Sequence, residues 1–159
     1  MKMLLALVFL FACTAAGAQP AHPKEPPAAQ VGVNILWYGM VNGEGERDPT
    51  GRPEKTDQVP ARKGAEFGVA FTLRGVPDGT KVKLRQVARY PAPGRHPPGG
   101  KLQKTDEADT ECEAGQTCFT SYAVEGADEI IPGQWTLELY YRGRKLMEQR
   151  FIMRYEGMV

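Results

Sequence analysis

The stretch that decides the fold is residues 135–153, WTLELYYRGRKLMEQRFIM. Large apolar side chains recur there at every second position, in 135–141 and again in 147–153, with Gln149 as the one polar exception. Alternation with a period of two is typical of β-strands that bury one face. The sequence Arg142-Gly143-Arg144 lies between the two runs and is a turn signal, so the stretch predicts a β-hairpin.

The register of this hairpin follows from which side chains must share a face. A two-residue loop would place Leu139 opposite the charged Glu148, in the apolar row. A three-residue loop, residues 142–144, instead places Leu139 opposite Met147 and keeps that face apolar. We therefore expect the three-residue loop, with its glycine or its last arginine in the left-handed conformation.

Four upstream segments also show strand periodicity: residues 31–41, 67–73, 82–87 and 119–124. Val87 falls out of step with Val82 and Leu84, which indicates a β-bulge. No stretch beyond residue 18 sustains a 3.6-residue period. Six or seven strands in a single domain, residues 31–159, predict an all-β, antiparallel sandwich of the immunoglobulin-like type, with a small antiparallel barrel as the alternative.

The first 18 residues predict export. Lys2, the apolar run 4–11 and Ala16-Gly17-Ala18 follow the order of a secretory signal peptide. The run is far shorter than the roughly 20 apolar residues that span a bilayer. An alternative is a lipoprotein signal, because Leu10-Phe11-Ala12-Cys13 resembles a lipobox, although Phe11 is bulky for its position. We expect a periplasmic or secreted protein, with an envelope lipoprotein anchored at Cys13 as the alternative.

Cleavage after Ala18 would also balance the charge. Lys2 would be lost, so the 20 basic residues would become 19, against 19 acidic ones. Proteins that bind nucleic acid or anionic membrane surfaces usually carry excess positive charge, so neither class is expected. Residues 19–30, QPAHPKEPPAAQ, hold four prolines and no large apolar side chain. They predict an extended tether between the leader and the domain.

Two long segments, residues 42–58 and 92–116, lack a strand pattern. Loops of more than about 12–15 residues in a compact domain are usually functional or disordered. We expect contact with an envelope protein or a glycan there, and the alternative is a pair of mobile insertions with no partner. Tyr140 is a further candidate because it faces away from Trp135. The candidate contact residues are Glu44, Glu46, Arg47, Asp48, Arg95, His96, Lys101 and Tyr140.

After cleavage the chain keeps two cysteines, Cys112 and Cys118. In an oxidising compartment they predict a disulfide, since a redox pair usually reads C-x-x-C and a metal site needs more ligands nearby. Closing a loop of about 7 residues corresponds to roughly 2.4 kcal/mol in the chain-entropy model. The predicted bridge is therefore a local clamp.

The sequence argues against catalysis. The chain has two histidines, His22 in the tether and His96 in a Pro/Gly loop, so a catalytic triad lacks a placed base. They also cannot complete a zinc site. The acidic runs 44–48 and 106–113 lack the ligand spacing of a calcium loop and are interpreted as solvated loops. No metal or cofactor is expected, and the alternative function is a carboxylate-based, glycosidase-like hydrolase, which requires one carboxyl with a raised pKa.

Aromatic side chains offer one more possibility, a platform on which sugars stack. The candidates are Trp37, Tyr38, Trp135, Tyr140 and Tyr141. Aromatic residues at strand period are more often part of the core. Trp135 in particular is expected to be buried against Phe151.

Four segments together resemble a bacterial family, domain of unknown function three-eight-five-nine, over residues 31–154. They are ILWYG at 35–39, VPARKGAEFG at 59–68, PGQWTLE at 132–138 and KLMEQRF at 145–151. The resemblance implies a small, exported, immunoglobulin-like protein, and it carries over no functional residue. Val59 stands where the family pattern has isoleucine, and Cys112 and Cys118 are not part of that pattern.

Overall fold

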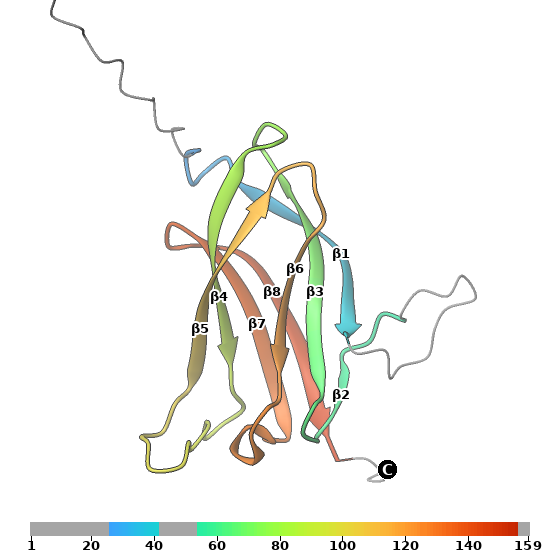
Figure 1. The fold of residues 1–159 in the computed structure, drawn as a ribbon, viewed down its shortest axis with the longest axis vertical. Coiled ribbons are helices and arrows are strands. Elements are labelled where there is room, and N and C mark those ends of the chain that lie inside the picture. The colour runs from blue at the N-terminus through green and yellow to red at the C-terminus, as the bar shows by residue number, and fades with distance from the viewer. Residues whose placement is uncertain (1–25, 42–53, 156–159) are drawn as a thin grey trace, which may run out of the picture.

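The computed structural model describes residues 26–41 and 54–155. Eight strands form a three-stranded sheet in the order β1-β3-β6 and a five-stranded sheet in the order β2-β8-β7-β4-β5 (Figure 1). All neighbours are antiparallel except β2 and β8. The all-β sandwich prediction is confirmed, with eight strands in place of six or seven. The strands are β1 (Gly32–Met40), β2 (Gln58–Pro60), β3 (Glu66–Arg74), β4 (Lys81–Arg89), β5 (Thr105–Glu113), β6 (Cys118–Ala123), β7 (Gly133–Tyr141) and β8 (Arg144–Arg154).

The core lies between the two sheets and is centred on aromatic rings. Phe67 of β3 packs against Phe151 of β8, with ring centroids 4.8 Å apart, and meets Trp135 of β7 edge to face at 5.7 Å. All three side chains are fully buried. The Trp135 indole N–H donates to the carbonyl of Ile131 at 2.9 Å, so the polar end of the buried ring is satisfied.

The predicted register of the closing hairpin is confirmed, because Leu139 lies opposite Met147. The predicted three-residue loop is wrong. Tyr141 pairs with Arg144, which leaves a two-residue turn with positive φ at Arg142 (48°) and Gly143 (80°). This turn suits the twist of the flanking strands. A bulge just beyond the turn absorbs one residue of β8 and restores the apolar register.

The predicted bulge at Val87 is also wrong, because β4 pairs with β5 without a break. Gln86 faces the interior, where its amide N–H donates to the Ser121 carbonyl at 2.8 Å and its carbonyl accepts from the Thr120 hydroxyl. These hydrogen bonds join the two sheets and satisfy a polar side chain in an inward position. Val87 faces outward and is buried there beside Glu138.

The prediction that residues 92–116 form a loop is wrong in its second half, which is strand β5. The acidic run 106–113 is therefore a strand and not a solvated loop. Its carboxylates face the cations of β4, with Glu111 3.6 Å from Lys81 and Glu107 3.5 Å from Arg85. Opposite charges that face each other across neighbouring strands favour strand pairing. The pairing of β4 with β5 therefore depends on these charges and less on apolar burial.

The predicted disulfide is present between Cys112 of β5 and Cys118 of β6, with Cα atoms 5.7 Å apart. Since β5 and β6 are edge strands of different sheets, the bridge closes one side of the sandwich. It is short in sequence but joins the two layers.

The end of the predicted tether departs from an extended form. Residues 26–30 make a turn, closed by the Gln30 amide and the Pro27 carbonyl at 3.0 Å. The Tyr141 hydroxyl donates to the Pro26 carbonyl at 2.7 Å, and the Arg144 side chain donates to Ala28 at 3.0 Å. The closing hairpin therefore holds this segment through its backbone carbonyls.

Candidate functional site

The residues predicted to contact a partner do not gather in one place. Glu44, Glu46, Arg47 and Asp48 lie outside the described residues. His96 and Lys101 are exposed in the β4–β5 connection. Tyr140 is partly buried on the outer face of the five-stranded sheet.

Arg95 is engaged within the domain. Its guanidinium lies 2.7 Å from Asp128 and 2.9 Å from Glu129, so it ties the β4–β5 connection to the β6–β7 connection. The hydrogen bond with Asp128 raises the pKa of Arg95 and lowers that of Asp128. A side chain held this way is better suited to fixing loops than to reaching a partner.

Tyr140 belongs to a charged network centred on Glu138. Its hydroxyl donates to Glu138 at 2.8 Å, and Arg89 and Lys145 approach the same carboxylate to 2.9 and 2.7 Å. The Glu138 side chain is 3% exposed. Burial alone would raise the pKa of Glu138, but these hydrogen bonds outweigh it and lower the pKa to about 2.

A second carboxylate lies opposite the first. Glu148 pairs across the strands with Glu138, and the Lys145 ammonium binds it at 2.7 Å. This hydrogen bond lowers the pKa of Glu148. A glycosidase needs one of its two carboxyls protonated near neutral pH. Both of these are held ionised, so the pair lacks a general acid.

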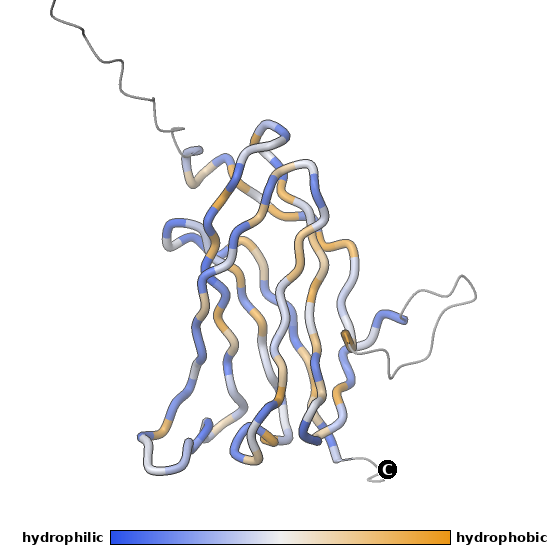
Figure 2. The backbone as a smooth tube through the Cα atoms, in the orientation of Figure 1, coloured by the Kyte–Doolittle hydropathy of each residue, from blue (hydrophilic) through white to orange (hydrophobic). Residues whose placement is uncertain are grey.

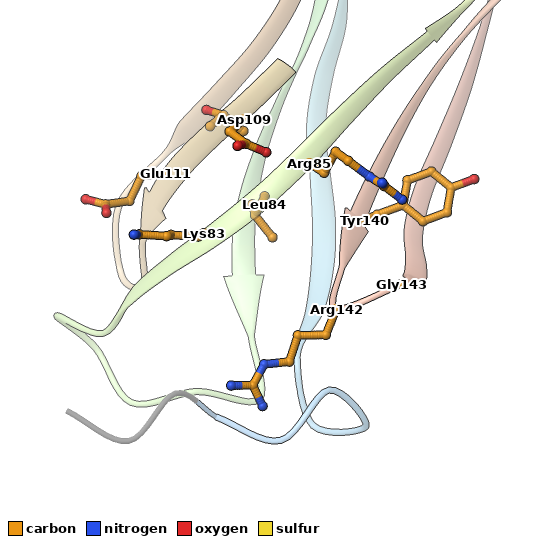
Figure 3. A pocket seen from close by; sticks show the side chains of 9 residues that line it. Lys83, Leu84, Arg85, Asp109, Glu111, Tyr140, Arg142 and Gly143 are labelled. Atoms are coloured by element: carbon orange, nitrogen blue, oxygen red, sulfur yellow. The ribbon is translucent and has the colours of Figure 1, made fainter. Parts of the chain in front are cut away.

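A shallow depression of about 650 Å³ opens where β4 and β7 diverge (Figure 3). Figure 3 shows Arg85 beside the Tyr140 ring and Arg142 extending away from the other labelled side chains. The Arg85 guanidinium lies 5.5 Å from the Tyr140 ring centroid. Basic side chains of β4 and of the β7–β8 turn line the depression together with acidic side chains of β5. Its charge therefore favours neither anionic nor cationic ligands. It is lined by Lys83, Leu84, Arg85, Asp109, Thr110, Glu111, Tyr140, Arg142 and Gly143.

The outer face of the three-stranded sheet carries an aromatic pair. Trp37 of β1 and Phe119 of β6 flank Ala70 of β3. Their ring centroids are 6.3 Å apart and their planes differ by 24°. Phe119 is 41% exposed and Trp37 is partly exposed. We call these two rings and the small residues beneath them, Gly39, Gly68 and Ala70, the aromatic platform.

Two glycines leave room on the sheet surface for the far ends of both rings. A Cβ at Gly39 would lie 2.8 Å from Cζ2 of Trp37, and a Cβ at Gly68 would lie 2.8 Å from Cζ of Phe119. The far end of each ring therefore occupies space that a side chain would fill. The two rings are stacked, with planes within 24° of parallel.

The three-stranded sheet is almost free of charge. Its strands contain two charged residues, Glu66 and Arg74, at the two ends of β3. Glu66 accepts a hydrogen bond from the Ser121 hydroxyl at 2.7 Å. Figure 2 shows the contrast, because β1 is mainly orange and white whereas blue predominates along β5. The two outer faces of the sandwich thus differ in chemistry.

Sequence reasoning found half of this pair. The sequence makes Trp37 a candidate for a stacking platform, whereas it predicts only that Phe119 lies in a strand, residues 119–124. Of the other aromatic candidates, Trp135 and Tyr141 are buried and Tyr38 packs against the core. A signal for the site did exist in β3, where Gly68 and Ala70 alternate with large residues and predict a face that needs cover from neighbouring strands.

Among the described residues, no helix is long and apolar enough to cross a bilayer. In the same part of the chain, no three histidine, cysteine or acidic side chains come together as a metal-binding group.

One solved structure matches the sandwich, and the match spans the whole of that other chain. It is an immunoglobulin-like protein from Pseudomonas aeruginosa, 25% identical, with a TM-score of 0.62, covering 81% of this chain and 100% of the other. The fold is immunoglobulin-like. This immunoglobulin-like domain also aligns with a Pseudomonas fluorescens alkylpurine DNA glycosylase bound to DNA containing an abasic site analogue, at 14% identity and a TM-score of 0.46, over 79% of this chain and 30% of that one. A score that low carries no functional argument. No family model matches the domain, and no curated protein matches it.

Proposed function

We propose that this protein is an exported, non-catalytic binding or accessory module of the bacterial envelope, a member of family three-eight-five-nine, and that the aromatic platform is its contact surface. The leader-like residues 1–18 support export, with a soluble periplasmic or secreted form favoured over an anchor at Cys13. The likeness to a bacterial immunoglobulin-like protein supports the module interpretation. A shared sandwich does not define a ligand, so the surface must carry the argument.

The observation that carries the proposal is a partly exposed aromatic pair, Trp37 and Phe119, on a sheet whose strands contain only two charged residues. Phe119 is 41% exposed, although strand aromatics usually provide core. Contiguous exposed apolar surface with a polar rim is typical of binding sites. The outer face of the five-stranded sheet carries charge instead, as in the network at Glu138.

Retention on isolated bacterial cell envelopes tests the proposal. We expect the mature protein to sediment with envelopes, and Trp37→Ala and Phe119→Ala to lose most of that retention. Leu102→Ala is the matched control, because Leu102 is 42% exposed but lies in the β4–β5 connection. Thermal unfolding of each variant checks that the fold is retained. Equal retention of all four proteins would overturn the assignment of the surface.

A further inference from the structure

We infer that the outer edge of β5 binds an extended, basic peptide segment of a partner protein, which adds to the five-stranded sheet as a further antiparallel strand. This inference goes beyond the proposed function, because it concerns a different surface from the aromatic platform. Three features of β5 support it: its position at the end of the sheet, the direction of its backbone groups, and the sign of its side chains.

The position of β5 leaves it with a neighbour on one side. It is the last strand in the order β2-β8-β7-β4-β5, and it pairs with β4 over its nine residues without a break. Cys112 is its one buried residue, and Asp106 and Ala108, on the same side of the strand as Cys112, are exposed. The core therefore does not cover this part of β5, which forms the margin of the sandwich in Figure 1.

The backbone of β5 directs alternate N–H and C=O groups away from β4. The Tyr90 amide donates to the Lys104 carbonyl at 3.0 Å, and the Ala114 amide donates to the Thr80 carbonyl at 2.9 Å. Hydrogen-bonded pairs alternate with non-bonded pairs in an antiparallel ladder, so the even-numbered residues of β5 bond to β4. The odd-numbered residues in 105–113 therefore turn their backbone groups to the outer edge, where no other strand of the described residues pairs with them.

Glu107 is consistent with this direction. Its N–H donates to the Asp106 carboxylate at 3.1 Å and not to a carbonyl of β4. The backbone groups of Asp109 and Glu111 lie further along the same edge. An extended peptide that adds to an open sheet edge gains its affinity from main-chain groups of this kind.

The other sheet edges carry features that hinder strand addition. β2 has three residues and ends in Pro60, and β1 is interrupted by a bulge between Ile35 and Trp37. At the edge strand β6, the Ser121 carbonyl already accepts a hydrogen bond from Gln86. β5 contains no proline, lysine or bulge. It is therefore the edge best suited to accept another strand.

The side chains of this edge favour a basic partner. Glu107, Asp109 and Glu111 follow one another at every second position and share the outer face of β5. On the β4 side, Arg85 lies 3.5 Å from Glu107 and Lys81 lies 3.6 Å from Glu111, yet these two acidic side chains are still 50% and 49% exposed.

A strand with lysine or arginine at alternate positions would place cations on the open side of the same carboxylates, as β4 does on the other side. A second copy of β5 would instead oppose carboxylate to carboxylate. The charge pattern therefore excludes self-pairing and matches a basic segment of another protein.

A short synthetic peptide tests the inference. We would titrate the mature protein with acetyl-Thr-Lys-Thr-Lys-Thr-Arg-Thr-amide, and the matched control is the same peptide with glutamate at its basic positions. Hydrogen exchange followed by NMR locates the contact. The amides of Asp109 and Glu111 should exchange about tenfold more slowly with the basic peptide and at an unchanged rate with the acidic one. No binding of the basic peptide would overturn the inference.

Two N-methylated forms of the basic peptide separate strand addition from charge attraction alone. Opposed residues of antiparallel strands share a face, so the basic residues of the peptide would lie opposite Glu107, Asp109 and Glu111 and turn their N–H groups to β5. N-methylation of the basic residues should weaken binding about tenfold. N-methylation of the inner threonines, at the same charge, should change it by less than about twofold. Equal affinity of the two forms would overturn strand addition.

Variants of the edge complete the test. Asp109→Asn removes one carboxylate and should weaken binding of the basic peptide about threefold, whereas Glu148→Gln on β8 should leave it unchanged. Asp109→Pro places a ring where the outward N–H was, so it should keep the pairing with β4 and abolish binding. Thermal unfolding checks both folds, and the N-methylated pair still decides if Asp109→Pro does not fold. Unchanged binding by Asp109→Asn and by a folded Asp109→Pro would overturn the assignment to this edge.

A second copy of this chain is the remaining occupant to test. If sedimentation velocity shows a dimer that Asp109→Pro dissolves, the edge pairs with another copy and the inference is overturned. None of these outcomes depends on retention through Trp37 and Phe119, so the inference and the proposed function can fail separately.

Discussion

Glu138 of β7 lies directly opposite Glu148 of β8, and one ammonium group, that of Lys145, binds both carboxylates at 2.7 Å. Two like charges opposed across neighbouring strands would repel. The shared cation, with Arg89 on the far side of Glu138, turns the repulsion into a network. This network fixes the outer face of the five-stranded sheet.

Acid should weaken the fold through Glu138. Its pKa falls from the usual 4.5 to about 2 in the folded protein, so its contribution is present above pH 4.5 and is lost as the pH falls towards 2. The shift corresponds to about 3 kcal/mol, and solvent screening of the half-exposed cations reduces that to about 2 kcal/mol. Urea unfolding of wild type and Glu138→Gln should differ by this amount at pH 7 and converge near pH 2.

The control for this prediction is Glu148→Gln, whose carboxylate is 33% exposed and should contribute less. If wild type and Glu138→Gln differ equally at pH 7 and pH 2, the network does not hold the charge of Glu138.

Replacing Cys112 and Cys118 with alanine should leave a folded protein. The bridge closes a short loop, so the free energy of unfolding should fall by about 2.4 kcal/mol, while inter-sheet hydrogen bonds such as that from Gln86 to Ser121 remain. Thermal unfolding by circular dichroism measures this. Loss of a cooperative transition would mean that the bridge organises the core.

Two glycines with nearly equal φ test the docking of residues 26–31. Gly75 (78°) has no room, because a Cβ would lie 1.8 Å from the Gln30 carbonyl oxygen, whereas a Cβ at Gly79 (79°) would meet nothing within 4 Å. Gly79→Ala should cost about 1 kcal/mol for the left-handed backbone, and Gly75→Ala about 3 kcal/mol. Chemical unfolding of both variants measures the difference. Equal costs would show that the segment does not pack there.

Alternation predicted the strands that bury one face. Residues 67–73 and 135–153 follow the rule because their apolar rows fill the core. Apolar alternation did not predict strand β5, because its pairing depends on charge complementarity with β4. The acidic residues of β5 do alternate along the strand: Glu107, Asp109, Glu111 and Glu113. The hairpin loop was missed because a bulge and a two-residue turn give the same apolar register as a three-residue loop.

The candidate site was less accessible to sequence reasoning. Trp37 and Phe119 are 82 positions apart. They meet only because β3 lies between β1 and β6, an order that no local pattern encodes. The glycines that leave room for the rings can be recognised only when the strand register is known, which places Gly68 beside Ser121.

Export should yield a mature chain that begins at Gln19. The small residues 16–18 set the cleavage site, and bulky Phe11 disfavours lipid attachment at Cys13. Intact-mass spectrometry of the protein recovered from envelopes measures this. A diacylglycerol-bearing mass that starts at Cys13 would replace the soluble form with an anchored one.

Hydroxyl-radical footprinting of the mature protein, with and without isolated envelopes, tests the central claim most directly. If the aromatic platform is the contact surface, oxidation of Trp37 and Phe119 should fall on binding, while that of Tyr155, which is 47% exposed, should stay constant. Protection of Tyr140 and Leu102 with Trp37 and Phe119 unchanged would contradict the account and move the contact to the five-stranded sheet and its loops.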